Sequence, residues 1–127
     1  MKTISCIRDE LNQNKIFAFE EVVRYYDLDF KKTSSIIGLI GNEVRLKLVW
    51  LIASQRFCVC DLADILQMSV PAISQHLRKL KDIGIVDFTR EKQTLYYHIA
   101  KENKVLVDHI IEILPPQVEI KNEKKIC

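Results

Sequence analysis

The sequence feature that most constrains the fold is a change in hydrophobic periodicity at Gly84. Before this residue, apolar side chains recur every three or four positions, which is typical of helices with one buried face. After it, apolar and polar residues alternate from Ile85 to Ile99, with the polar Glu91-Lys92-Gln93 in the middle. Such a pattern predicts a two-stranded hairpin. We therefore expect a mainly α-helical chain with a small β-hairpin.

Two short helices are expected directly before Gly84, joined by Gln67-Met68-Ser69. The first covers Cys58–Leu66. The second follows Ser69, whose hydroxyl can cap it, and has Pro71 in its first turn, where a missing N–H costs nothing. Its inner face is formed by Ile73, Leu77 and Leu80. Two short helices, a tight turn and a following hairpin predict a winged helix-turn-helix.

Further helices are predicted over residues 16–27, 36–40, from Glu43 onwards, and from Glu102 to Leu114. Thr33-Ser34-Ser35 offers capping hydroxyls before the second of these, and Gly41-Asn42 ends it. The expected organisation is a flexible arm over residues 1–15, one domain over residues 16–114, and a disordered tail over residues 115–127.

Basic residues are concentrated in the segment that is expected to form the helix after Ser69 and the hairpin. Between Ser69 and Lys101 there are six basic and three acidic residues, although the whole chain has a net charge of only +2. Polar and basic side chains on such a helix can reach base edges in the major groove, and a hairpin tip can contact phosphate or the minor groove. The partner that this pattern predicts is double-stranded DNA. The predicted contact residues are Ser69, Pro71, Ser74, Gln75, His76, Arg78 and Lys79 on the helix, and Arg90, Lys92, Gln93 and Thr94 on the hairpin.

The sequence gives little support to other function classes. No nucleophile–base pair, glycine-rich phosphate loop or carboxylate pair indicates an enzyme, and no organic cofactor is expected. Residues 1–6 lack the apolar core of a signal peptide, and the apolar stretch near residues 48–53 is too short to span a bilayer. We therefore expect a cytoplasmic protein without a membrane partner. In that compartment Cys6, Cys58, Cys60 and Cys127 favour metal ligands or thiol sensors over structural disulfides.

Several ordered motifs resemble the ArsR/SmtB family of metal-responsive repressors. They are Val44-Arg45-Leu46-Lys47-Leu48, Cys58-Val59-Cys60-Asp61-Leu62-Ala63, Ser74-Gln75-His76-Leu77-Arg78-Lys79-Leu80 and Gly84-Ile85-Val86. The resemblance covers about residues 33–114. It implies a homodimer joined by the first and last helices, which sits on operator DNA until an inducer releases it. The residues expected at the dimer interface are Phe19, Val22, Val23, Val105, Leu106, His109, Ile110 and Ile113.

Cys58 and Cys60 are the expected core of a metal site. Residues two apart lie about 200° around a helix axis, so both can face one ion only in the first turn or where that turn unwinds. A helix N-terminus also favours the thiolate form that metals bind. An ion that takes both sulfurs would strain the helix preceding the DNA-reading helix.

The family resemblance implies a third thiolate for this site, Cys6 from the opposite subunit. Cys127 is a less favoured additional ligand, which the resemblance does not supply. Where arsenic sensors often carry a third cysteine, this chain has Ala63. A three-sulfur site suits As(III), Sb(III) or Pb(II), while Cd(II) and Hg(II) also remain open. The expected inducer is thus a thiophilic ion.

Three alternatives stay open at this point. One is a thiol redox or persulfide sensor, in which Cys6 or Cys127 supplies the partner of a disulfide. Another is a protein that sequesters metal without operator specificity. The third is a zinc site of His98, His109 and Glu112, whose spacing matches the family's zinc sensors but whose register does not.

Overall fold

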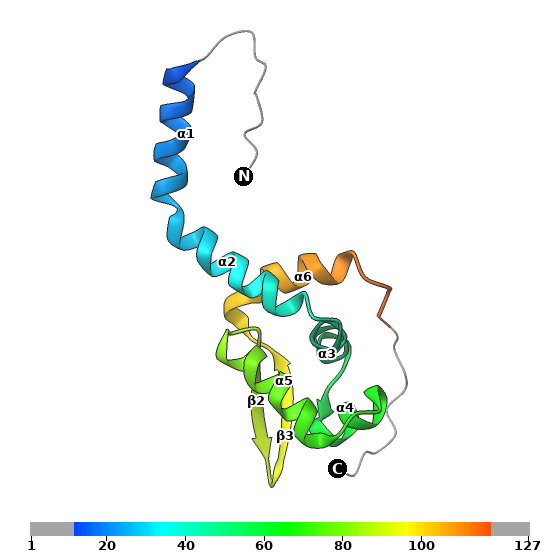
Figure 1. Ribbon diagram of the computed structural model, residues 1–127. Helices are drawn as coiled ribbons and strands as arrows, with labels where there is room; N and C mark the ends of the chain where they lie inside the picture. Colours follow the sequence, from blue (N-terminus) through cyan, green and yellow to red (C-terminus); the bar gives the residue numbers. More distant parts are fainter. Residues whose placement is uncertain (1–11, 118–127) are drawn as a thin grey trace, which may run out of the picture. The chain divides into compact units, whose positions relative to one another are not determined.

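The computed structural model describes residues 12–117 and shows a mainly helical chain with a small antiparallel sheet (Figure 1), as predicted. In chain order the elements are α1 (Gln13–Tyr25), α2 (Asp27–Ile40), α3 (Glu43–Ser54), β1 (Phe57–Cys58), α4 (Val59–Leu66), α5 (Val70–Asp82), β2 (Val86–Glu91), β3 (Thr94–Ile99), the 3-10 turn η1 (Lys101–Asn103) and α6 (Lys104–Glu112). The chain divides after Ser34 into two compact units.

The described part of the first unit contains α1 and the beginning of α2. Helix α1 begins three residues before its expected start because Asn12 caps it: the Lys15 N–H donates to Asn12 Oδ1 at 2.9 Å. Residues 13–15, which fall in the expected arm, are therefore helical. Residues 1–11 of that arm lie outside the described chain.

The predicted start of the second helix is wrong. Thr33-Ser34-Ser35 does not cap a helix but lies inside α2, which already begins at Asp27. Asp27 and Asp29 place negative charge in the first turn, where the helix dipole favours it. The Ser34 hydroxyl donates to the Lys31 carbonyl at 3.0 Å, one turn back. A serine can satisfy its hydroxyl in this way within a helix, so a run of hydroxyl residues does not have to mark a helix start.

In the second unit, α3, α4 and α5 share one apolar core with β2 and α6. Asn42 caps α3 by accepting from the Arg45 N–H at 3.2 Å, as the Gly41-Asn42 break predicts. The fully buried side chains of this core include Leu48, Val49, Leu62, Ile73, Leu77, Leu80, Ile85, Val86 and Val107. The two helices predicted around Gln67-Met68-Ser69 are thus present, and both are anchored by apolar residues.

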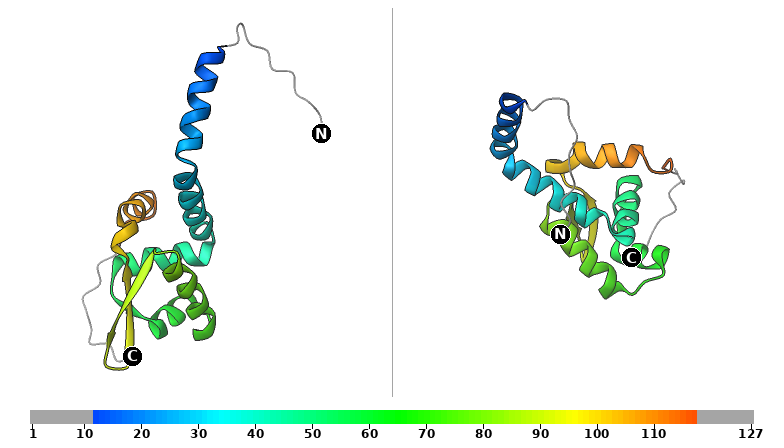
Figure 2. Two further views of the ribbon diagram at one scale, coloured as in Figure 1. Left: turned by 90° about the vertical axis from the view of Figure 1, so that its left-hand side faces the viewer. Right: turned by 45° about the horizontal axis from the view of Figure 1, so that its top comes forward.

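The hairpin is confirmed, and a third strand joins it. Strands β2 and β3 pair antiparallel from Val86↔Ile99 to Glu91↔Thr94, which leaves a two-residue turn at Lys92-Gln93. Lys92 has a φ of 58°, in the left-handed region. The turn end projects beyond α4 and α5 (Figures 1 and 2). The short strand β1, which periodicity does not reveal, pairs with the other side of β3.

The last helix is shorter than its prediction, because residues 101–103 form a 3-10 turn and α6 ends at Glu112. After α6 the chain returns to α3, where Trp50 Nε1 donates to the Pro115 carbonyl at 2.9 Å. Residues 118–127 of the expected tail lie outside the described chain. Within residues 12–117, no helix has the length and apolar character needed to cross a membrane.

Candidate DNA-reading surface and cysteine site

Helix α5 begins and ends where the sequence predicts. Ser69 is its N-cap, with Oγ accepting from the Ala72 N–H at 3.2 Å, and Pro71 lies in the first turn. Gly84 follows the C-cap with a φ of +83°, a conformation that glycine adopts without steric cost. Ile73, Leu77 and Leu80 are 0% exposed, so they fix the inner face of α5 on the core.

The opposite face of α5 is available to a partner. Pro71, Ser74, Gln75, Arg78 and Lys79 are all exposed, as is the capping Ser69. His76 differs, because it is half-buried and its Nδ1 accepts from Arg45 Nε of α3 at 3.3 Å. The structure therefore places the predicted DNA-contacting residues of α5 on one exposed face, with the exception of His76.

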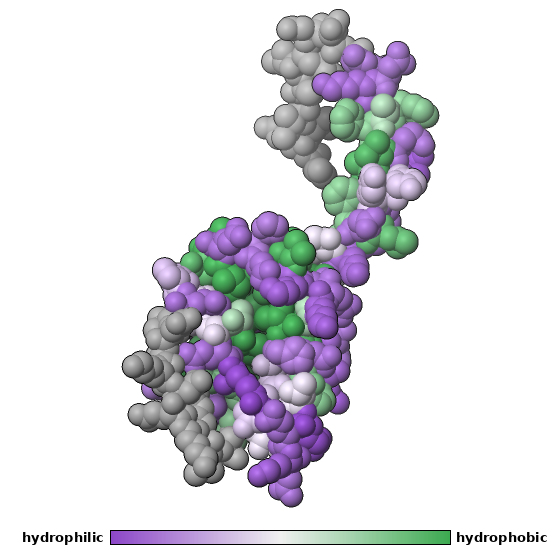
Figure 3. Space-filling view, turned by 180° about the vertical axis from the view of Figure 1, so that it is seen from behind, coloured by the Kyte–Doolittle hydropathy of each residue, from purple (hydrophilic) through white to green (hydrophobic). Residues whose placement is uncertain are grey.

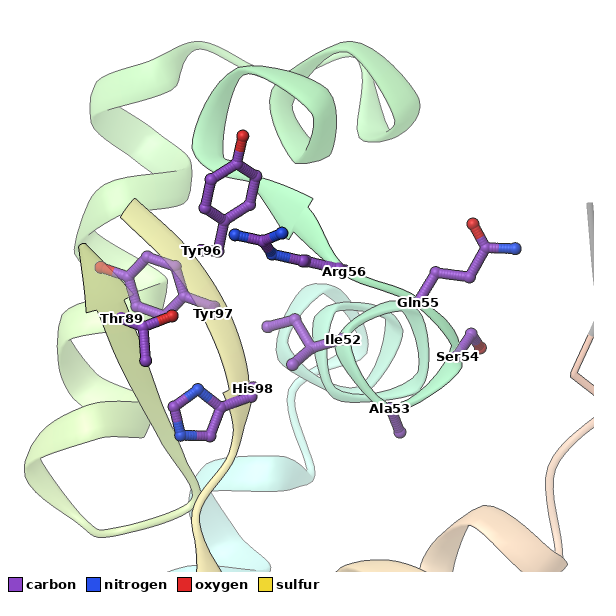
Figure 4. A pocket seen from close by; sticks show the side chains of 9 residues that line it. All are labelled: Ile52, Ala53, Ser54, Gln55, Arg56, Thr89, Tyr96, Tyr97 and His98. Carbon is purple, nitrogen blue, oxygen red and sulfur yellow. The ribbon is translucent and has the colours of Figure 1, made fainter. Parts of the chain in front are cut away.

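The hairpin tip presents a second polar surface. Arg90, Lys92 and Gln93 are exposed and Thr94 is half-buried. Arg56, two residues after the end of α3, contacts the turn end of the hairpin: it pairs with Glu91 and lies over the Tyr96 ring at 3.7 Å from its centroid. Figure 4 shows this guanidinium directed toward Tyr96, beside a cavity of about 320 Å³. Arg56, which sequence reasoning did not single out, thus ties the hairpin to the helical core.

The two central cysteines lie at the start of α4, but in different environments. Cys58 is the last residue of β1 and the N-cap of α4, and it is 1% exposed. Its backbone N–H donates to Asp61 Oδ2 at 3.4 Å. Cys60 lies in the first turn and is exposed. Cys58 is disulfide-bonded, and Cys60 is a free thiol. The helix predicted to start at Cys58 therefore starts one residue later, and its N-terminus carries both sulfurs.

Two sulfurs from one chain do not make a complete metal site. Among residues 12–117 no group of three or more histidine, cysteine, aspartate or glutamate side chains could hold an ion. His98, His109 and Glu112, the residues of the zinc alternative, do not form such a group within the single chain. Cys6 and Cys127, the expected additional ligands, lie outside the described residues. The donors that are described fit a thiophilic ion by type, since both are sulfur, but not by number.

The predicted dimer-interface residues divide into two groups. On α1, none of whose residues is buried, Phe19 is 62% exposed and Val22 and Val23 about half. In Figure 3, apolar side chains in green lie among polar ones in purple along α1. On α6, Val105, His109 and Ile113 are exposed, whereas Leu106 and Ile110 are half-buried against the core. Both helices thus leave large apolar side chains without cover in the single chain.

Comparison with known proteins decides the family. The model for "Bacterial regulatory protein, arsR family" matches residues 42–87, from the cap of α3 into β2. The cadmium resistance transcriptional regulatory protein CadC of Listeria innocua is 34% identical over 105 residues, which cover 81% of this chain and 82% of that protein. The chain belongs to the arsR family of bacterial regulatory proteins. Its relatives are DNA-binding transcriptional regulators, not enzymes.

The chain is also similar to another curated regulator and to solved structures. The arsenical resistance operon repressor of Staphylococcus aureus is 26% identical, covering 79% of this chain and 92% of that protein. The transcriptional regulator HlyU of Vibrio vulnificus has a TM-score of 0.62 at 28% identity, covering 72% of this chain and 96% of that one. The Mycobacterium bovis protein Mb0332, a homodimeric winged helix-turn-helix domain, has a TM-score of 0.61 at 24% identity, over 69% and 82% of the two chains. The winged helix-turn-helix fold is therefore confirmed.

Like Arg56, Arg45 makes contacts that the sequence did not predict. Its Nη1 donates to the Leu39 carbonyl of α2 at 3.0 Å, while its Nε donates to His76. Burial lowers the pKa of His76, and the positive charges of Arg45 and Lys79 lower it further. The ring is thus neutral near pH 7, as an Nδ1 acceptor has to be.

The His76 environment predicts a pH-dependent stability. Because the pKa of His76 is below 6.5 in the folded chain, the unfolded chain binds a proton more readily. The free energy of unfolding should therefore hold its full value above pH 6.5 and decrease as the pH falls below it. His76→Asn, which keeps an acceptor that does not titrate, should remove this part of the decrease. Urea unfolding of wild type and His76→Asn at pH 7.5 and 5.5 measures how much unfolding free energy each protein loses on acidification. Equal losses in the two proteins would contradict the prediction.

Proposed function

We propose that this protein is a metal-responsive transcriptional repressor. It binds operator DNA as a homodimer, and a thiophilic ion bound by Cys58 and Cys60 releases it. The observation that carries the proposal is the position of both sulfurs at the N-terminus of α4, the helix directly before the exposed face of α5. The relatives' names support it, since one is a cadmium resistance regulator and another an arsenical resistance repressor.

In this proposal α5 reads the operator and the hairpin holds the duplex. Ser74, Gln75 and Arg78 present hydroxyl, amide and guanidinium groups from one exposed face, which are the groups that recognise base edges in the major groove. Lys79 adds charge for phosphate on the same helix, and Arg90 and Lys92 add it on the hairpin. Helix α5 can present these groups firmly because its inner face is fully buried.

Arg78→Ala should weaken operator binding about tenfold, the effect of losing one specific side-chain contact to DNA. The matched control is Lys47→Ala, which removes one exposed positive charge from α3, where it pairs with Glu43 at 3.4 Å. Fluorescence anisotropy with a labelled operator duplex at moderate salt measures both variants. Equal affinities of the two variants would contradict the assignment of α5 as the reading helix.

The proposed metal site uses the two described sulfurs as thiolates. Cys58 and Cys60 would hold the ion, and the proposal adds Cys6 of the other subunit as a third ligand, with Cys127 as the alternative. Metal binding needs both thiols reduced and deprotonated, so the disulfide on Cys58 has to be opened first. A bound ion supplies a rigid link between the sulfurs.

Release of DNA follows from the different environments of the two cysteines. Cys58 is buried in β1, whereas Cys60 is exposed on the first turn of α4. Because Cys58 is buried and Cys60 is exposed, an ion that takes both sulfurs would in this proposal rearrange the start of α4. Because α4 and α5 share the core through Leu62, Ala63 and Leu77, this rearrangement shifts α5 as well. A dimer reading two half-sites tolerates little change in the spacing of its reading helices, so the affinity for DNA falls.

An ion titration tests the proposal and identifies the inducer. The reduced protein bound to its operator is titrated with As(III), Pb(II), Cd(II), Hg(II) and Zn(II), while anisotropy follows the DNA and ultraviolet absorption follows sulfur–metal bonds. We expect at least one thiophilic ion to release the DNA at the concentration where the sulfur–metal absorption saturates. Binding of ions without any release would favour the sequestering alternative, and no binding at all would exclude the metal site.

A thiol redox sensor is the second candidate, and the disulfide on Cys58 is the observation that favours it. Two thiols that form a disulfide lose two protons and two electrons to an oxidant such as peroxide. If the cysteines sense oxidation, peroxide alone should release the operator in metal-free buffer, and a thiol reductant should restore binding. A repressor that senses only metals should bind DNA equally under both conditions.

A further inference from the structure

Arg45 connects three helices of the second unit through one guanidinium group. It lies in the first turn of α3, and it donates from Nη1 to Leu39 of α2 and from Nε to His76 of α5. Leu39 is in the last turn of α2, where backbone carbonyls lack partners within their own helix. A cation at this position stabilises the helix end. The same cation also contacts the middle of the candidate reading helix.

The hydrogen bond between Arg45 and His76 adds a directional constraint on α5, which the contacts of its apolar face do not provide. Hydrophobic contacts of Ile73, Leu77 and Leu80 hold α5 against the core, but such contacts are not directional. A hydrogen bond is directional, since it weakens steeply when donor and acceptor are misaligned. His76 lies between Gln75 and Leu77, at the border of the exposed and buried faces. Its bond to Arg45 therefore limits rotation of α5 about its own axis.

We propose that Arg45 is a positioning residue for operator binding, which acts through His76 to set the orientation of the exposed face of α5. This inference rests on the proposed reading role of α5. It assigns Arg45 no contact with DNA. The side chain instead holds the His76 ring against α3, and through it keeps Ser74, Gln75 and Arg78 directed outward.

The contact is sensitive to protonation of the ring. His76 accepts at Nδ1, so a proton on this atom replaces the acceptor with a donor that faces the Arg45 guanidinium. The charged groups around the ring are Arg45 from α3 and Lys79 from α5, and both repel an imidazolium. Operator affinity should therefore hold at neutral pH and decrease below pH 6.5, where the protonated ring separates from Arg45.

Four variants and one control test the proposal with a labelled operator duplex at pH 7.5 and 5.5. Arg45→Met removes both hydrogen bonds while keeping an apolar stem, and His76→Leu removes only the bond to α5. Each should weaken operator binding about tenfold at pH 7.5, on the order of one lost hydrogen bond to a charged group. His76→Asn, which keeps an acceptor, should bind like wild type at pH 7.5 and should lack the part of the decrease at pH 5.5 that His76 causes. Arg78→Ala and its control Lys47→Ala test separately whether the exposed face of α5 contacts the operator.

Salt dependence separates positioning from direct contact. A phosphate contact that is lost reduces the slope of log affinity against log salt by about one. Arg45→Met should leave this slope unchanged, whereas loss of an Arg45–phosphate contact would lower it and overturn the proposal. Wild-type affinity in His76→Leu, or an unaltered pH dependence in His76→Asn, would also overturn it, and both can be measured even if Arg45→Met does not fold. If Arg78→Ala binds normally, the reading role of α5 fails instead.

Discussion

Phe19→Asp combined with Val23→Asp is expected to lower operator affinity about 100-fold or more. Both side chains are exposed on one face of α1, where burial of apolar surface against a second copy would stabilise a dimer. Two charges on this face oppose that contact. A monomer reads one half-site, so it loses the gain from linked binding of two modules, which is on the order of 10²–10⁴-fold.

Sedimentation velocity and operator anisotropy together measure this effect. The matched control is Phe17→Asp with Tyr25→Asp, which adds the same charges to exposed aromatic positions about 120–160° away from Phe19 and Val23 around the helix. The control should remain dimeric and should bind DNA like wild type. A Phe19→Asp/Val23→Asp protein that stays dimeric would show that α1 is not the dimer interface.

Leu77→Ala should have the second large effect, a loss of about 2–5 kcal/mol in the free energy of unfolding. Leu77 is 0% exposed on α5, and it packs in the core that also holds α3 and α4. Truncating the Leu77 side chain leaves a cavity beneath α5. Urea unfolding measures the loss, with Gln75→Ala as an exposed control on the same helix that should change stability by about 0.5 kcal/mol or less. If Leu77→Ala lowers the free energy of unfolding by less than 1 kcal/mol, Leu77 does not anchor α5 in the core.

Helix α5 and the hairpin could be predicted because their signals are local. Ser69, Pro71 and Gly84 mark the ends of α5 by capping chemistry, and the periodicity of its apolar residues gives the buried face. The change to alternation after Gly84 similarly predicts the hairpin. The structure and the family comparisons confirm these elements and the fold class.

Other features depend on information that a local pattern does not carry. Thr33-Ser34-Ser35 has the composition of a helix cap, but Ser34 satisfies its hydroxyl within α2. Strand β1 has two residues, too few to show a period, although its pairing with β3 decides that Cys58 is buried. The exposed Cys60 therefore differs from Cys58 in a way that spacing alone does not reveal.

Side-chain contacts between distant positions were the least accessible to sequence reasoning. Arg45 and His76 are 31 residues apart, and the sequence predicts His76 only as a DNA-contacting residue. The contact becomes visible once α3 and α5 are packed together. Arg56 is a similar case, since its partners Glu91 and Tyr96 belong to the hairpin and not to the helix before it. Tertiary packing, not local propensity, determines these partners.

The most direct test of the proposed function is operator release by the inducing ion in wild type and in the Cys58→Ser/Cys60→Ser variant. Both proteins are reduced, bound to the same labelled duplex, and titrated with the ion that releases wild type. We expect the variant to bind DNA like wild type without metal, and to stay bound when the ion has released wild type completely. If the variant releases its operator at the same ion concentration as wild type, Cys58 and Cys60 are not the sensing site.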